Sequence, residues 1–194
     1  DTSGWASTVE EFLASPVDLW LERLLAHHHR LFGMPPSTSQ VNAWKEEHQI
    51  MVEALKQCLA AESTTVAQWA IIFEYELPME GGRRPDVVVL AGKSVIVLEF
   101  KSKKIFSLAD IDQTVGYARD LHDYHSASSG LPCAALLVLT KAPVNMAELF
   151  EEIPVVGRNS ISSYLMANRH PGQIDVDSWV EGKYEPLPML VEAA

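Results

Sequence analysis

The stretch that most constrains the fold is RRPDVVVLAGKSVIVLEFKSKK, residues 83–104, in which two acids stand among apolar runs. Residues 87–90 and 95–100 are rich in β-branched side chains, which predicts two strands. Gly92 and Lys93 lie between them and predict a hairpin with a two-residue turn. We therefore expect this part of the chain to form two neighbouring antiparallel strands.

The expected register of this hairpin brings charged side chains together. Counting outward from the turn places Asp86 directly opposite Glu99, so their Cβ atoms would lie roughly 5 Å apart on one face. Lys101 returns to that face because the strand period is two, whereas Phe100 points to the other face. The sequence thus predicts two carboxylates and an amine converging at one point.

Two carboxylates at this distance repel each other unless a cation lies between them or one is protonated. Oxygen ligands without thiolate or imidazole suit Mg²⁺ or Mn²⁺. Such an ion would polarise a phosphoryl oxygen and activate water, and Lys101 would orient that water or stabilise developing charge. The alternative is a cross-strand salt-bridge cluster facing solvent. The nearly continuous apolar strands favour covered faces instead, where charges without a role are costly.

These residues carry a resemblance to a known family. Arg84-Pro85-Asp86, the hairpin and Glu99-Phe100-Lys101 resemble the signature of the PD-(D/E)XK nuclease superfamily. Gln113 and Tyr117, in a helix expected over 108–124, resemble the Gln-x-x-x-Tyr motif of its RecB-like branch, and their i, i+4 spacing puts them on one helix face. The alternative for that pair is an ordinary amphipathic helix with a core tyrosine.

The resemblance implies an α/β fold with a restriction-endonuclease-like αβββαβ core, that is, a mixed central sheet flanked by helices. It also implies that Asp86 and Glu99 bind the metal, with the Phe100 carbonyl as a further ligand. Gln113 and Tyr117 would lie beside this site and hold the lysine or the nucleic-acid strand.

Many members of the superfamily also carry a glutamate on the first core helix that adds to the metal site. Glu47, next to the apolar stripe of the expected helix, is the candidate here, whereas Glu46 points further round. Most helix glutamates are plain surface residues, and this is the alternative for Glu47.

Periodicity and turn signals divide the chain into one domain with a core and two extensions. We expect a helical N-terminal extension over 1–39, broken at Pro16, and a C-terminal extension over 143–194 that holds a helix over 161–168 and an irregular segment over 172–184. The core, 40–142, is expected to contain a helix over 40–61, strands over 69–77, 87–90 and 95–100, a helix over 108–124 and a buried parallel strand over 132–140.

Net charge and its distribution limit the partners. The chain carries a formal charge of −11, which argues against a protein that coats nucleic acid. Residues 83–104 contain six basic and two acidic side chains, a local charge of +4 that leaves −15 for the rest. This pattern fits a site that binds phosphates through a small basic segment. Arg84 and Lys103 are the candidates for phosphate contacts, and each is equally a candidate for a rim salt bridge.

The sequence contains no apolar run of about 18 residues, so no membrane span is expected. Cys58 and Cys133 lie in apolar surroundings and are typical of reduced core thiols, although a disulfide between them stays open. We therefore expect a cytoplasmic protein.

The layout also resembles the N-terminal nuclease-like domain of large bacterial proteins that continue into a Schlafen-type superfamily-one helicase. The matching pieces are Trp44, 73–78, 83–86, 99–101, 113–125 and Glu192-Ala193-Ala194. A Walker motif is absent from these 194 residues, so any motor would lie outside them.

We expect a Mg²⁺- or Mn²⁺-dependent nuclease acting on nucleic acid, DNA rather than RNA, with a helicase domain in cis as a further partner. The alternative is a catalytically inactive module of the same fold that binds nucleic acid or regulates a helicase. A restriction-type enzyme is a third alternative, but the chain offers no separate recognition segment. The oligomeric state stays open.

Overall fold

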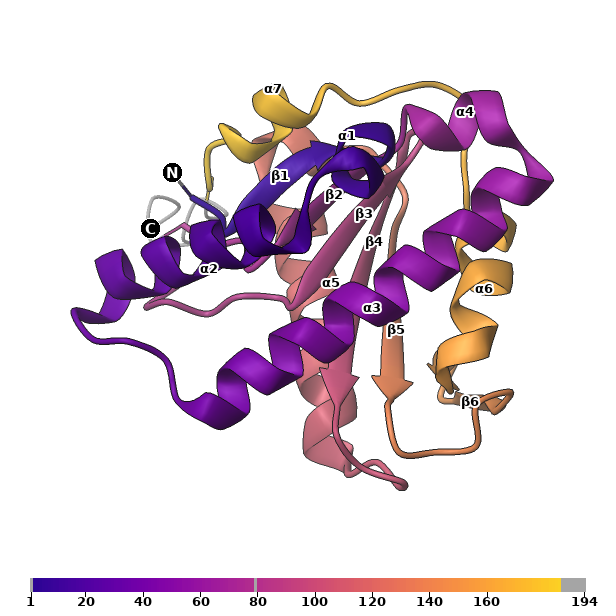
Figure 1. Cartoon of the computed structure of the whole chain (residues 1–194). Coiled ribbons are helices and arrows are strands. Elements are labelled where there is room, and N and C mark those ends of the chain that lie inside the picture. The colour runs from indigo at the N-terminus through magenta and orange to yellow at the C-terminus, as the bar shows by residue number, and fades with distance from the viewer. Residues whose placement is uncertain (1, 79, 186–194) are drawn as a thin grey trace, which may run out of the picture.

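A mixed seven-stranded sheet runs through the centre of the molecule (Figure 1). The structure is a computed structural model and describes residues 2–78 and 80–185, so the matching residues 192–194 lie outside the described residues. The strands are β1 (Trp5–Thr8), β2 (Ala70–Phe73), β3 (Val87–Ala91), β4 (Ser94–Lys101), β5 (Cys133–Leu139), β6 (Ala147–Phe150) and β7 (Ile153–Val156). Their order in the sheet is β1-β2-β3-β4-β5-β7-β6, and only the β4–β5 and β5–β7 pairs are parallel.

Helices cover both faces of this sheet. They are α1 (Val9–Ala14), α2 (Val17–Phe32), α3 (Thr38–Ala61), α4 (Ser63–Ala67), α5 (Leu108–Tyr124), α6 (Ile161–Ala167) and α7 (Val176–Val180), with short 3₁₀ turns at Ser126–Ser128 and Arg158–Ser160. The first four helices and α6 share one apolar core with the sheet, whereas α5 and α7 pack on the opposite face. In Figure 1 α3 therefore lies in front of the sheet and α5 behind it.

The β3–β4 hairpin has the expected register. Val87 pairs with Leu98 and Ala91 pairs with Ser94, which leaves Gly92 and Lys93 as the turn. Gly92 has a φ of 66°, a left-handed conformation that glycine adopts without strain. Both strands are almost wholly buried, as their continuous apolar runs predicted.

The elements of the expected core occur in the predicted order, helix, three strands, helix and strand. The helix expected over 108–124 is α5, with those same bounds, and it begins at a capping box in which Ser107 and Asp110 exchange hydrogen bonds. The strand expected over 132–140 is β5, and it lies parallel to β4 as predicted. The short helix α4 between α3 and β2 was not expected.

The structure corrects three further expectations, one in the core and one in each extension. The N-terminal extension is not only helical, because β1 pairs antiparallel with β2 and forms an edge of the sheet. The strand expected over 69–77 ends at Phe73, because Glu74 has a φ of 54° and leaves the extended conformation. The C-terminal extension adds β6 and β7 to the sheet, and the segment expected to be irregular contains α7 with a buried Trp179.

Among the described residues, every helix is too short or too polar to cross a lipid bilayer.

Candidate active site

Carboxylates from four places in the chain meet at one end of the antiparallel strands β2, β3 and β4. Glu47 of α3, Glu74 after β2 and Asp86 before β3 each place one carboxylate oxygen within 4.8 Å of the others. Glu99 of β4 joins them, because its Oε1 accepts a hydrogen bond of 2.8 Å from the Asp86 backbone N–H. We call these four residues the acidic cluster.

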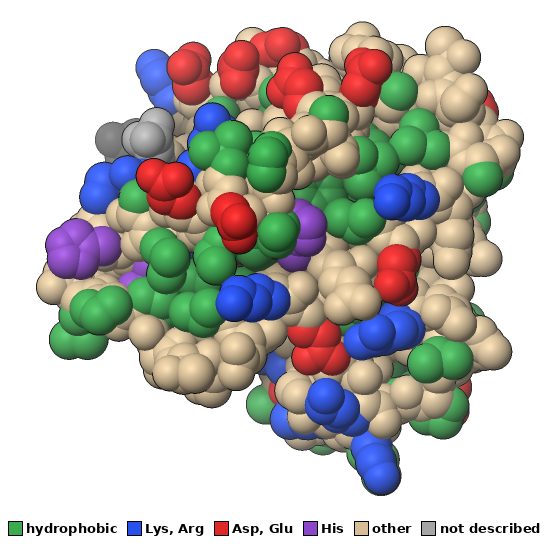
Figure 2. Space-filling model, in the orientation of Figure 1, with side chains coloured by type: hydrophobic (Ala, Val, Ile, Leu, Met, Phe, Trp, Pro, Cys, Tyr) green, Lys and Arg blue, Asp and Glu red, His purple; other side chains and the backbone are tan. Residues whose placement is uncertain are grey.

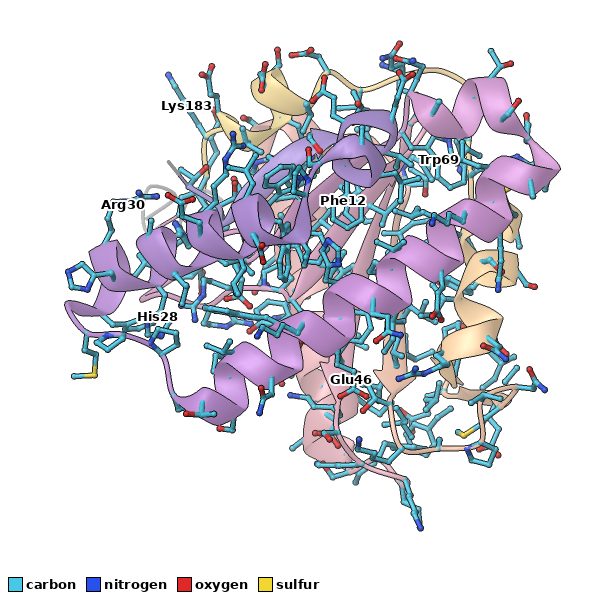
Figure 3. The ribbon with its side chains drawn as sticks, in the orientation of Figure 1. Phe12, His28, Arg30, Glu46, Trp69 and Lys183 are labelled. Carbon is cyan, nitrogen blue, oxygen red and sulfur yellow. The ribbon has the colours of Figure 1, made fainter. Side chains whose placement is uncertain are left out.

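Glu47 enters the cluster from α3 and is only 5% exposed. Its Oε2 is buried and has no hydrogen-bond partner among the described residues, which is costly for a charged oxygen. The preceding residue, Glu46 (labelled in Figure 3), contacts Arg158 at 3.2 Å and Lys141 at 3.7 Å instead. Of these two neighbouring glutamates on α3, the structure brings Glu47 to the predicted site.

Glu74 is the member of the cluster that sequence reasoning missed. Its Oε1 accepts a hydrogen bond of 3.0 Å from Trp44 Nε1, and its Oε2 lies 2.9 Å from Arg84 Nε. Strand alternation would place Glu74 on the face opposite Phe73 and Trp44, but its left-handed backbone turns the side chain toward α3. The only signal in the sequence is an acid that directly follows the apolar run 69–73.

The carboxylates of Asp86 and Glu99 both accept hydrogen bonds from backbone N–H groups across the hairpin. The Phe100 N–H donates to Asp86 Oδ2 at 2.8 Å, and the Asp86 N–H donates to Glu99 Oε1 at 2.8 Å. The Phe100 side chain packs into the core on the α3 face, while Glu99 is 2% exposed. The hairpin register therefore fixes both carboxylates by main-chain hydrogen bonds.

The buried position of the cluster shifts its protonation. Burial, followed by the negative charge of Glu74, raises the pKa of Asp86 to about 7, although the Phe100 N–H, Lys101 and Arg84 act in the opposite direction. Burial, followed by repulsion from Asp86, raises the pKa of Glu47 and of Glu99 well above the ordinary value. A site with these shifts favours a bound proton or a bound cation.

Lys101, Gln113 and Tyr117 form a chain of hydrogen bonds beside the acidic cluster. Lys101 Nζ donates to Gln113 Oε1 at 2.7 Å, and Gln113 Nε2 donates to the Tyr117 hydroxyl at 3.2 Å. The guanidinium of Arg83 lies 5.1 Å from the centre of the Tyr117 ring. The structure thus brings the predicted lysine and the predicted pair on α5 together.

The two residues predicted to contact phosphate lie at different places in the structure. Arg84 lies at the acidic cluster, bonded to Glu74 and, at 2.7 Å, to the Gly82 carbonyl. Lys103 instead binds both carboxylate oxygens of Asp110, at 2.7 and 3.0 Å, beside the first turn of α5. Both side chains are therefore salt-bridged, which is the alternative that the sequence left open for each.

Two cavities lie elsewhere in the described structure. One of about 650 Å³ is lined by residues of β1, α2 and α7, and one of about 390 Å³ by residues of α5, β5 and the β6–β7 turn. Neither is lined by a residue of the acidic cluster.

The chain matches no family model, no curated protein and no solved structure.

Proposed function

We propose that this protein is a metal-dependent nuclease that hydrolyses phosphodiester bonds of nucleic acid, DNA rather than RNA. The observation that carries the proposal is the buried Glu47 carboxylate, whose Oε2 has no partner among the described residues. An oxygen of this carboxylate lies within 4.8 Å of oxygens of Glu74 and Asp86. A cation at this point would satisfy that oxygen and relieve the repulsion among the acids.

The donor set fits Mg²⁺ or Mn²⁺. Every member of the acidic cluster offers carboxylate oxygens, and hard oxygen ligands suit these ions. Oxygens that already accept one hydrogen bond keep a further lone pair, so Glu74, Asp86 and Glu99 remain available. These three residues and Glu47 would hold the ion, and the resemblance adds the Phe100 carbonyl.

A divalent ion in this site supplies Lewis-acid activation of a phosphoryl oxygen and lowers the pKa of bound water. The protein's own contribution is to position Lys101. Gln113 Oε1 accepts one N–H of the ammonium at 2.7 Å, which leaves two N–H groups for the attacking water or the developing negative charge. Tyr117 fixes the rotamer of Gln113 through the 3.2 Å hydrogen bond.

The order of elements supports a finer assignment of the fold. Apart from the short helix α4 and the 3₁₀ turn at Ser126–Ser128, the run α3, β2, β3, β4, α5 and β5 has the αβββαβ pattern of the PD-(D/E)XK core, with the cluster at the ends of its three antiparallel strands. We therefore propose that the mixed sheet is a core of this type, extended by β1 on one side and by β7 and β6 on the other.

Cleavage assays test the proposal directly. Labelled single- and double-stranded DNA and RNA would be incubated with Mg²⁺, Mn²⁺ or chelator. We expect metal-dependent hydrolysis that Asp86→Ala abolishes and that Lys101→Ala lowers by about 10²- to 10³-fold, the usual effect of removing one transition-state donor. Lys104→Ala, which changes an exposed lysine three residues further on, is the matched control and should keep full activity.

Unchanged cleavage in Asp86→Ala or Lys101→Ala would remove the assignment. Metal binding without cleavage of any substrate by the wild type would favour the inactive module of the same fold.

A further inference from the structure

An exposed aromatic side chain stands next to the acidic cluster. Phe32, the last residue of α2, is 45% exposed, and Met34 beyond it is 61% exposed. Figure 2 shows apolar side chains gathered with histidines at the left of the molecule, over the end of α2 and the loop that leads to α3. The ring of His28 (labelled in Figure 3) lies 4.6 Å from the Phe32 ring at an angle of 48°.

Arg84 connects this aromatic surface to the acidic cluster. Its guanidinium carbon lies 4.9 Å from the centre of the Phe32 ring, while its Nε contacts Glu74 at 2.9 Å. Phe32 is thus separated from a carboxylate of the cluster by one side chain. We call Phe32 and the Arg84 guanidinium the stacking platform.

The charges around the site leave little attraction for phosphates. Several of its cations are already neutralised by carboxylates of the fold. These ion pairs are Arg83 with Glu80 and Asp120, Arg84 with Glu74, Lys103 with Asp110, and Arg119 with Asp120. The whole chain carries −11, so electrostatic binding along a nucleic-acid backbone is weak. Stacking of bases on aromatic and guanidinium planes is a source of affinity that does not depend on net charge.

Building on the proposed function, we infer that the stacking platform binds an unpaired base of the strand whose phosphate faces the acidic cluster. In a duplex each base is covered by its neighbours in the stack, so an exposed protein ring reaches only a base that is unpaired or at an end. The substrate class is therefore single-stranded nucleic acid or an unpaired end.

Binding of defined strands tests this inference. A fluorescein-labelled oligothymidylate of roughly 12 nucleotides and a duplex of equal length would be titrated by fluorescence anisotropy. Ca²⁺, which also takes oxygen ligands, would replace Mg²⁺, with a denaturing gel to verify intact strands. We expect the wild type to bind the single strand at least about tenfold more tightly than the duplex.

Substitutions at Phe32 separate stacking from folding. We expect Phe32→Ala to weaken single-strand binding about tenfold, the loss of one stacked base, and Phe32→Trp to retain it. Leu149→Ala is the matched control, because Leu149 is 75% exposed on the distant edge strand β6 and should not matter. Thermal unfolding and Mn²⁺ titration of Phe32→Ala should match the wild type, which would show that the fold and the metal site are intact.

An abasic residue moved stepwise along the oligonucleotide identifies the stacked base. At one position it should weaken wild-type binding about as much as Phe32→Ala does, and it should add nothing further in that variant.

If Phe32→Ala binds the single strand with wild-type affinity, or if the wild type binds single strand and duplex equally, the inference is overturned. The proposed nuclease function would still stand if metal-dependent cleavage is observed. A dimer that Phe32→Ala dissociates would assign the surface to a second copy of the chain and overturn it too. Absence of both strand binding and cleavage in the wild type would remove the proposed function together with the inference.

Discussion

At the scale of one residue, the buried carboxyl group of Glu47 makes the stability of the folded protein depend on pH. Its pKa in the folded protein lies well above the ordinary value near 4.5, because the carboxyl group is buried among other acids. The folded state therefore holds a proton that the unfolded state releases, so Glu47 lowers stability as pH rises above about 4.5.

Glu47→Gln removes this titration while keeping the shape of the side chain. In the presence of chelator we expect the variant to be more stable than the wild type by about 1–2 kcal/mol at pH 8, with little difference at pH 4. Urea unfolding at several pH values measures the difference. A gap between the two proteins that does not grow with pH would contradict the account of the cluster.

The residues of the site differ in how far sequence could predict them. Asp86, Glu99 and Lys101 follow from counting outward from a two-residue turn, because a hairpin's register is local. Glu74 could not be placed in this way, because its left-handed φ of 54° reverses the face that alternation assigns. The Lys103–Asp110 pair was equally hidden, since the path of the loop between β4 and α5 decides it.

At the scale of elements, the β3–β4 turn depends on Gly92. A Cβ at this position would clash with the backbone carbonyl of His170, and the φ of 66° disfavours any other residue. We expect Gly92→Ala to destabilise the protein by about 2–4 kcal/mol in thermal or urea unfolding.

Gly130→Ala separates the clash from the backbone effect. Gly130 also has a positive φ, 73°, but a Cβ there meets nothing within 4 Å. Gly130→Ala should therefore destabilise the protein by about 1 kcal/mol, the effect of backbone strain alone. Equal destabilisation by the two substitutions would show that the contact with His170 does not matter.

The elements that sequence predicted are those with strong local signals, namely the hairpin, α5 with its Ser107 cap, and the apolar run of β5. The edge strands lacked such signals. β1 has only four residues, and its pairing partner β2 is far away in the chain. The β6–β7 turn uses Glu151 and Glu152 at positive φ, 47° and 72°, where glycine or asparagine would have indicated a hairpin.

At the scale of the whole molecule, the net charge of −11 predicts how the affinity for a nucleic-acid strand depends on salt concentration. Because the body repels phosphates and several cations near the site are ion-paired, few counterions should be released when a strand binds. We expect affinity for the single-stranded probe to fall less than about tenfold between roughly 50 and 200 mM salt. Anisotropy titrations over this range measure the slope. A steep slope, typical of six or more phosphate contacts, would show that the strand binds to a basic surface and would contradict this prediction.

The central claim is that the acidic cluster binds a divalent cation, and calorimetric titration of Mn²⁺ into chelator-treated protein tests it most directly. We expect binding by the wild type, at least about tenfold weaker binding by Asp86→Asn, and wild-type binding by Glu46→Gln, which changes the neighbouring glutamate outside the cluster. An absence of binding by the wild type, or equal binding by all three proteins, would contradict the claim.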